Sequence, residues 1–210
     1  MLWPALSQRT CAVREPSATI PITPFAKGTN LSRRRFLMAA TGFLASVTNS
    51  AFANQNQVNF WNEPRRLRLY RPSTNEWVNQ VYWADGKVNY EGYANICRLL
   101  RDTRYNEAVE MDFVTLDIAR GIQGWLENYR VDQPLIIHSG YRDPRTNAAT
   151  EGAAKNSLHM LGQAIDLSIQ GVSAGQIAQF GLYLSGGGVG YYPGRDFTHL
   201  DRGRVRFWVG

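Results

Sequence analysis

The sequence predicts an α+β fold, a single small domain with an antiparallel sheet and flanking helices. Three observations carry this prediction. Apolar residues alternate with polar ones near the start of the folded part and again near its end, which is typical of strands. Two long helical patterns lie between these strand regions. The length of 210 residues suits one domain, or at most two small ones.

The first half of this domain contains two expected strands and two expected helices. Apolar residues alternate over 66–71 and over 77–83, and the turn dipeptide that follows predicts a hairpin or meander. Helical patterns then cover about 90–101 and 112–129. A proline ends the second helix, and residues 135–137 begin a buried strand.

The second half begins with a long loop. The buried strand ends in the turn-rich segment 138–147, in a loop of about fifteen residues that reaches His159, and long irregular loops of compact domains tend to be functional. A strand is expected over 164–169, and Ser173 is expected to cap a helix that runs to about Leu184. The glycine-rich segment 185–190 then precedes the last strands.

Residues 1–53 predict a twin-arginine export signal rather than part of the fold. Ser32-Arg33-Arg34-Arg35-Phe36-Leu37 fits the twin-arginine pattern, 38–47 is apolar, and Ala51-Phe52-Ala53 has the small residues of a cleavage site. The alternative is a membrane anchor, but this apolar run is well short of the roughly 20 residues that span a bilayer. We therefore expect a folded domain over 54–210, in the periplasm, without a stable membrane span after cleavage.

Removing the signal changes the charge of the protein. The whole chain carries a net charge of +6, but residues 1–53 hold six basic residues and one acid. Residues 54–210 keep 17 basic and 16 acidic residues, a net charge of about +1, and this gives no support for nucleic acid as a partner. The alternating arginines over 202–206 predict one solvated edge of a strand.

Cysteine usage excludes an internal disulfide in the mature domain. One cysteine, Cys11, lies in the signal, and Cys97 remains alone. Cys97 falls in a helical pattern, where a buried thiol is the ordinary outcome, so we do not expect a catalytic cysteine.

Two histidines and an aspartate predict a metal site. His159 and Asp166 lie seven residues apart, and a turn at Gly162 into a strand at Ala164 would return the carboxylate to the imidazole. With His199 they offer a three-ligand zinc site whose open corner admits a reactive water, whereas structural zinc sites are closed by four ligands. The alternative for His159 is a buried histidine satisfied by hydrogen bonds.

Hydrolysis at such a site also needs a base. Asp196 lies three residues before His199, and Asp201 lies two after it on the same face of a regular strand. Each has an alternative role, as a turn residue or as a partner that holds the imidazole. The sequence leaves the choice open.

The loop before His159 carries two further candidates. Arg142 is expected to project into the cleft, where it would stabilise an oxyanion or clamp a carboxylate, and its alternative is a salt bridge with Asp143. His138 is expected to support the fold or the site, and its alternative role is that of a metal ligand. The glycines of 186–190 lack the lysine of a phosphate loop.

These motifs resemble the zinc D-Ala-D-Ala peptidase superfamily, which includes the Hedgehog-like fold. The resemblance rests on Ser139-Gly140-Tyr141-Arg142, on Ser157-x-His159-x-x-Gly162-x-Ala164-x-Asp166, and on a late His199. It is greatest to exported murein endopeptidases of the MepK type, which also end in Gly-Val-Gly-Tyr-Tyr-Pro and His-x-Asp. It covers nearly all of 54–210.

The resemblance implies roles for the site residues. His159, Asp166 and His199 become the Zn²⁺ ligands, and Arg142 becomes the residue that orients the substrate. The superfamily places its base three residues before the last ligand, here Asp196, but this chain departs from the usual Glu-x-x-His form.

The expected function is that of an exported zinc-dependent peptidoglycan endopeptidase that cuts peptide cross-links between stem peptides. One alternative is a D,D- or L,D-carboxypeptidase that trims stem peptides. A second, from another class, is a non-catalytic zinc-containing module that binds the cell wall.

Overall fold

The computed structural model describes residues 60–210, so the predicted signal peptide over 1–53 lies outside the described residues. Within the described part, one eight-stranded sheet has the order β3-β2-β1-β4-β5-β7-β6-β8. The strands are β1 (Arg65–Arg71), β2 (Glu76–Ala84), β3 (Lys87–Val88), β4 (Leu135–Ser139), β5 (Ala164–Ser168), β6 (Gly188–Tyr192), β7 (Phe197–Asp201) and β8 (Arg206–Val209). The helices are α3 (Tyr90–Leu99), α4 (Phe113–Asn128), α5 (Pro144–Ala148), α6 (Ala174–Leu184) and the 3₁₀ helix η1 (Leu158–Leu161).

The α+β class is confirmed, but the sheet is mixed rather than antiparallel. β1 pairs in parallel with β4, and β6 pairs in parallel with β8. The chain between β1 and β4 contains α3 and α4, and a connection of that length allows a parallel return. The short connection between β7 and β8 reverses the chain, so β8 runs opposite to β7 and in the same direction as β6, which it joins on the side away from β7. The comparison with a Hedgehog-like fold stays a prediction.

The predicted strands and hairpin at the start of the domain are confirmed. β1 and β2 pair in antiparallel register, and β2 turns into β3 at Asp85 and Gly86. Both turn residues have positive φ, 53° and 73°, which is the backbone of a tight hairpin turn and suits an Asp-Gly dipeptide.

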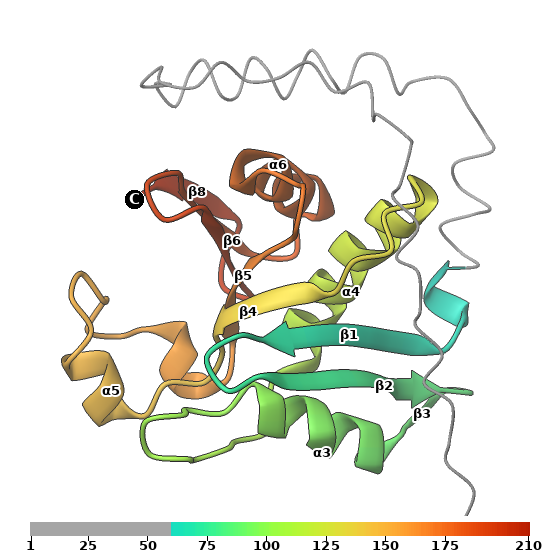
Figure 1. Ribbon diagram of the computed structural model, residues 1–210, viewed down its shortest axis with the longest axis horizontal. Coiled ribbons are helices and arrows are strands. Elements are labelled where there is room, and N and C mark those ends of the chain that lie inside the picture. Colours follow the sequence, from blue (N-terminus) through green and yellow to red (C-terminus); the bar gives the residue numbers. More distant parts are fainter. Residues whose placement is uncertain (1–59) are drawn as a thin grey trace, which may run out of the picture. The chain divides into compact units, whose positions relative to one another are not determined.

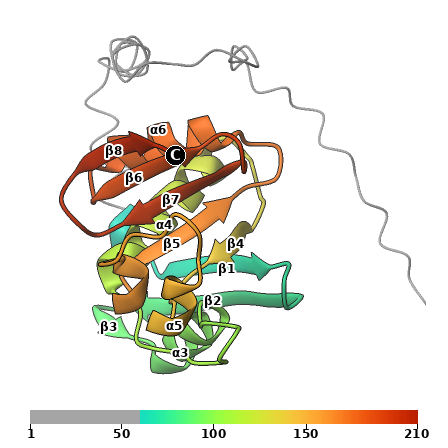
Figure 2. The same cartoon turned by 90° about the vertical axis from the view of Figure 1, so that its left-hand side faces the viewer.

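The hydrophobic core lies between one face of the sheet and the three longer helices. α3 packs on β1 and β2, α4 packs on β1 and β7, and α6 packs on β6, β7 and α4. Figure 2 shows the strands side by side, with α4 and α6 behind them and α5 in front. Alternating strand residues such as Leu67, Leu69, Ile165 and Leu167 are fully buried in this core. The side chains between them face the other side of the sheet.

The predicted helix over 112–129 is confirmed as α4. Not all of the apolar residues that its periodicity places on one face are buried. Asp112 caps the helix and accepts hydrogen bonds from the backbone N–H groups of residues 114 and 115. Ile118 and Ile122 are buried as their spacing indicates, whereas Val114 and Tyr129 at the two ends are 43% and 50% exposed. The middle of the helix is therefore better buried than these two positions near its ends.

The long predicted loop leaves the sheet after β4 and contains the short helix α5 (Figure 1). Its first residue, Gly140, lies against the chain that follows α3. A Cβ at Gly140 would stand 2.3 Å from the carbonyl oxygen of Leu100. The neighbouring backbone N–H of Tyr141 donates to that oxygen at 2.8 Å. The start of the loop is therefore held against the backbone at Leu100.

We expect Gly140→Ala to destabilise the domain by about 1–3 kcal/mol, because the new methyl group collides with backbone that cannot move freely. Urea unfolding of both proteins measures the difference. Gly175→Ala in α6 is the matched control, since the nearest neighbour of a Cβ there would be Tyr191 at 3.7 Å, an ordinary van der Waals contact. Equal unfolding midpoints for wild type and the Gly140 variant would contradict the close approach.

Two further sequence expectations have clear outcomes. Cys97 is buried at 7% exposure, as expected, and burial raises the pKa of its thiol. The arginines over 202–206 do not share one strand edge, because β8 begins only at Arg206. Arg202 pairs with Asp112 at 2.5 Å instead. Among residues 60–210, no helix combines the length and the apolar character that crossing a membrane requires.

Candidate metal centre

Strand pairing brings Asp166 and His199 together. They are directly opposite each other in the antiparallel pair β5–β7, so both side chains stand on the same face of the sheet. Their neighbours Ile165 and Leu200 point into the core on the other face. The alternation of apolar and polar residues in these two strands therefore aims the polar pair away from the core.

A tight turn brings His159 to this pair. His159 lies in η1, which Ser157 caps, and the chain then turns at Gly162 into β5. Gly162 has a φ of 66°, and a Cβ there would stand 2.8 Å from the carbonyl oxygen of Glu110. Glycine is therefore required at this turn both for its backbone conformation and for space, as the sequence predicted.

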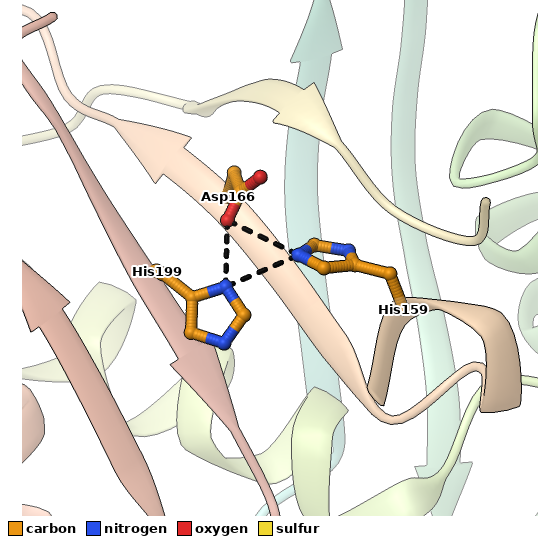
Figure 3. Close-up of side chains that lie close together, drawn as sticks. All are labelled: His159, Asp166 and His199. Carbon is orange, nitrogen blue, oxygen red and sulfur yellow. Dashed lines mark hydrogen bonds and ion pairs between the residues drawn. The ribbon is translucent and has the colours of Figure 1, made fainter. Parts of the chain in front are cut away.

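The three side chains converge on one point (Figure 3). Nε2 of His159 lies 3.1 Å from Nδ1 of His199 and 3.3 Å from Oδ1 of Asp166. Nδ1 of His199 lies 2.8 Å from the same carboxylate oxygen. Of all the described residues, only this group places three potential metal-ligand atoms within 4.8 Å of one another.

Each imidazole is held through its other ring nitrogen. Nδ1 of His159 lies 2.6 Å from the carbonyl oxygen of Gly140, which accepts only, so this nitrogen carries the proton and Nε2 has a free lone pair. Nε2 of His199 lies 3.0 Å from Oδ2 of Asp201 and donates to it. Such contacts fix the tautomer and the ring orientation that a metal ligand needs.

Burial and close contact shift the pKa values of all three groups. Burial lowers the pKa of His159, and Asp166 only partly offsets this effect. Burial also acts to lower the pKa of His199, but its hydrogen bonds with Asp166 and Asp201 outweigh burial and raise it. Burial acts to raise the pKa of Asp166, and the two histidines lower it far more. The carboxylate is therefore ionised at neutral pH.

Arg142 lies beside the cluster rather than in a surface salt bridge. Its Nη2 pairs with the second carboxylate oxygen of Asp166, and its Nε donates to the hydroxyl of Ser139 at 2.8 Å. Its backbone N–H donates to the carbonyl oxygen of His159 at 3.2 Å. The alternative pairing with Asp143 does not occur, because Arg145 takes that carboxylate at 2.7 Å.

Asp201 has all its acceptor positions engaged. It is 1% exposed, and its Oδ1 accepts from the backbone N–H groups of Gly188 and Gly203 at 3.1 and 2.7 Å. Arg206 donates to both of its oxygens, at 3.0 and 2.6 Å, and His199 donates to one of them. This arrangement favours a role in holding His199 over a role as a base.

Asp196 is not brought to the cluster. It lies on the exposed turn between β6 and β7 with a φ of 48°, and its Oδ1 lies 3.4 Å from the backbone N–H of Ala174 at the start of α6. The structure describes no contact between Asp196 and His199. The role of base for Asp196 stays a prediction.

The cluster opens into a cleft of about 650 Å³, a size that suits a peptide segment. One wall is the loop from Tyr141 to His159, and the other is made by the last strands. Trp208 belongs to this second wall, where its ring lies 5.2 Å from that of His199 and its Nε1 donates to the hydroxyl of Tyr192. His138 also borders the cleft and lies 2.7 Å from the hydroxyl of Ser168.

Sequence reasoning missed several of these residues. Trp208 and Arg206 fall in a C-terminal segment whose pattern indicated only a strand. Gly190 was a usable signal, because a Cβ there would stand 2.6 Å from the ring of Trp208. A glycine at that position of a strand indicates that a bulky side chain crosses over it.

The donor set fits a metal ion. Two imidazole nitrogens and one ionised carboxylate oxygen face each other at hydrogen-bond distances, and each group is fixed by a partner on its far side. This combination of nitrogen and oxygen ligands suits zinc, and three protein ligands leave one position open. Two imidazoles and a carboxylate that border an open cleft are typical of a mononuclear metal-dependent hydrolase.

The chain belongs to the family of peptidoglycan L,D-endopeptidase MepK, whose family model matches residues 60–208. The resemblance inferred from the motifs is thereby confirmed, and the domain is a member of a peptidase family that acts on peptidoglycan.

Three relatives show how far the similarity extends. Peptidoglycan L,D-endopeptidase MepK of Escherichia coli strain K12 is 33% identical over 184 residues, which is 84% of this chain and 97% of that protein. Probable peptidoglycan L,D-endopeptidase MepK of Haemophilus influenzae is 40% identical over 53% of this chain and 61% of that protein. Zinc D-Ala-D-Ala carboxypeptidase of Streptomyces albus G is 38% identical over 37% of this chain and 31% of its own.

Proposed function

We propose that this protein is an exported, zinc-dependent murein endopeptidase that hydrolyses peptide cross-links between stem peptides of the cell wall. The observation that carries the proposal is the convergence of His159, Asp166 and His199 at the floor of a cleft in a member of the MepK family. The zinc relative from Streptomyces supports the choice of metal.

His159, Asp166 and His199 would hold the ion. Zinc in such a site supplies a Lewis acid that activates water and polarises the substrate carbonyl. The protein's own contribution is to fix the ligands. Gly140 and Asp201 orient the two rings, and a ligand set that is fixed in advance needs no rearrangement when the substrate arrives.

Arg142 is proposed to orient the substrate. Its guanidinium lies at the cluster with one side bonded to Asp166 and Ser139. A planar, permanently charged group beside the metal centre can donate hydrogen bonds to the carbonyl oxygen of the bond that is cut. Negative charge develops on that oxygen during hydrolysis, and the arginine would stabilise it. The sheet and the loop fix its position, so the interaction requires little reordering.

Export by the twin-arginine route is proposed from residues 1–53, which would place the enzyme in the periplasm with its substrate. The absence of an internal disulfide in the mature chain agrees with this route, because the domain does not need an oxidising compartment to fold.

The test is digestion of purified sacculi. We expect the protein over 54–210 to release muropeptides, a chelator to stop the release, and added zinc to restore it, because activity depends on the ion. Mass spectrometry of the products identifies the bond. Products that lack only a terminal residue would favour the carboxypeptidase alternative, for which the Streptomyces relative is the supporting observation. Binding to sacculi without any release would favour a wall-binding module.

A further inference from the structure

Arg71 is a buried arginine without a counter-ion. It is the last residue of β1, it is 5% exposed, and it borders the cleft. Its Nη1 donates to the carbonyl oxygens of Leu99 at 2.8 Å and Arg101 at 2.6 Å. Among residues 60–210, its Nε is buried without an acceptor and its guanidinium has no ion-pair partner.

The nearby carboxylates are already occupied. Glu76 accepts from Arg101 at 2.9 and 3.1 Å and from Thr74 at 2.6 Å. Asp102 accepts from three backbone N–H groups, those of Arg104, Tyr105 and Asp143. Burial and the adjacent Arg101 lower the pKa of Arg71, and the two acids offset this effect only in part.

A buried cation without a partner indicates a missing anion. Arginine stays protonated in proteins, so Arg71 cannot escape the cost of burial by losing its charge. Its guanidinium is held by two carbonyl groups and is therefore ordered before any ligand arrives. A carboxylate forms strong, charge-assisted hydrogen bonds with a guanidinium, and it would supply the negative charge that Arg71 lacks.

A second arginine borders the same cleft. The backbone N–H of Arg104 donates to Asp102, the carboxylate whose charge also acts on Arg71. Arg104 is exposed, borders the cleft, and makes no ion pair with any described residue. Two arginines line the cleft, one buried and one exposed, and their charge makes an anionic group the favoured occupant.

This part of the cleft is connected to the metal centre by short, rigid links. The carbonyl oxygen of Leu100, between the two carbonyls that hold Arg71, accepts from the backbone N–H of Tyr141. Arg142 follows directly and reaches Asp166. β1 is separated from β5 by β4 alone, and two strand spacings correspond to about 10 Å. A ligand group a few bonds from the reacting carbonyl spans that distance.

We propose that Arg71 and Arg104 form a carboxylate subsite, which holds a free acid group of the stem peptide while the bond is cut at the metal centre. The inference rests on the proposed function, since it names the substrate group that the same cleft recognises. It makes the enzyme selective for substrates whose acid group near the cut bond is not amidated.

The experiment compares two forms of one substrate. A defined cross-linked muropeptide dimer is prepared with a free carboxyl group beside the cross-link and with that group converted to a carboxamide. We expect the wild type to prefer the acid over the amide by about 10- to 100-fold in kcat/KM, as a charge-assisted pair implies. In Arg71→Met this ratio should fall towards one, whatever happens to the overall rate.

Two further variants make the result decisive. Arg101→Met is the matched control, because Arg101 is a buried arginine of the same region that pairs with Glu76 and does not border the cleft, so the ratio should stay at the wild-type value. Arg104→Met should also lower the ratio. Because Arg104 is exposed, this variant is expected to fold, and it tests the subsite even if Arg71→Met is unstable.

Each outcome bears on one proposal. A wild-type ratio in both Arg71→Met and Arg104→Met would overturn the subsite, as would a wild type that cuts acid and amide equally well. A wild type that cuts neither form would count against the proposed function instead.

Discussion

Replacing His159 by alanine is expected to remove bound zinc and hydrolytic activity together. His159 is 1% exposed and supplies one of three ligand atoms, and its Nε2 is fixed in place by the bond from Nδ1 to the carbonyl oxygen of Gly140. No other described histidine or acid stands close enough to replace it. Two remaining ligands leave the ion weakly held, and activity should fall to the level of a protein-free control.

Metal content after dialysis, measured by elemental analysis, checks the first effect, and muropeptide release from sacculi checks the second. His138→Ala is the matched control for metal content, because His138 borders the same cleft but lies outside the cluster. It should keep one zinc per chain. A His159 variant that is free of metal and still active would refute the ligand assignment.

Replacing Asp201 by asparagine is expected to weaken zinc binding by about 10- to 100-fold, because the residue holds the ring of a ligand rather than transferring protons itself. Asp201 accepts five hydrogen bonds, one of them from Nε2 of His199. Asparagine keeps the shape but loses the charge and one acceptor. His199 is then free to change its tautomer, and its Nδ1 no longer presents a lone pair reliably.

Zinc titration with a competing chelator measures the affinity, and turnover is recorded as a function of added zinc. Activity that returns at high zinc would agree with a positioning role. A variant that binds zinc normally and stays inactive at every zinc concentration would show that Asp201 is the base. Asp196→Asn in the same assay tests the other candidate, for which normal zinc binding and lost turnover are expected.

The sequence predicted the centre of the site because its residues are tied to local patterns. A turn at Gly162 and the alternation in β5 place His159 and Asp166 together, and both signals lie within eight residues. His199 was predicted as a ligand because the mature chain has few histidines and this one has acidic neighbours. The pairing of β5 with β7 brings His199 into contact with Asp166. These positions are 33 residues apart, so the pairing leaves no local signal in the sequence.

The remaining features depend on contacts distant in sequence. The parallel pairing of β1 with β4 is decided by how the intervening helices pack, which residue alternation does not encode. The cleft wall formed by Trp208 likewise depends on β8 returning beside β6. Arg71 was read as one arginine of an alternating strand, and only its burial between two carbonyl groups distinguishes it.

The buried thiol of Cys97 gives the domain a natural reporter of opening. Its sulfur accepts the backbone N–H of Met111 inside the core, and it is the one free cysteine of the described residues. In a Cys11→Ser background, a thiol reagent would reach Cys97 only when α3 separates from the core. The labelling rate then reports how strongly each bound ligand, metal or peptide, keeps the native state closed, without any enzymatic assay.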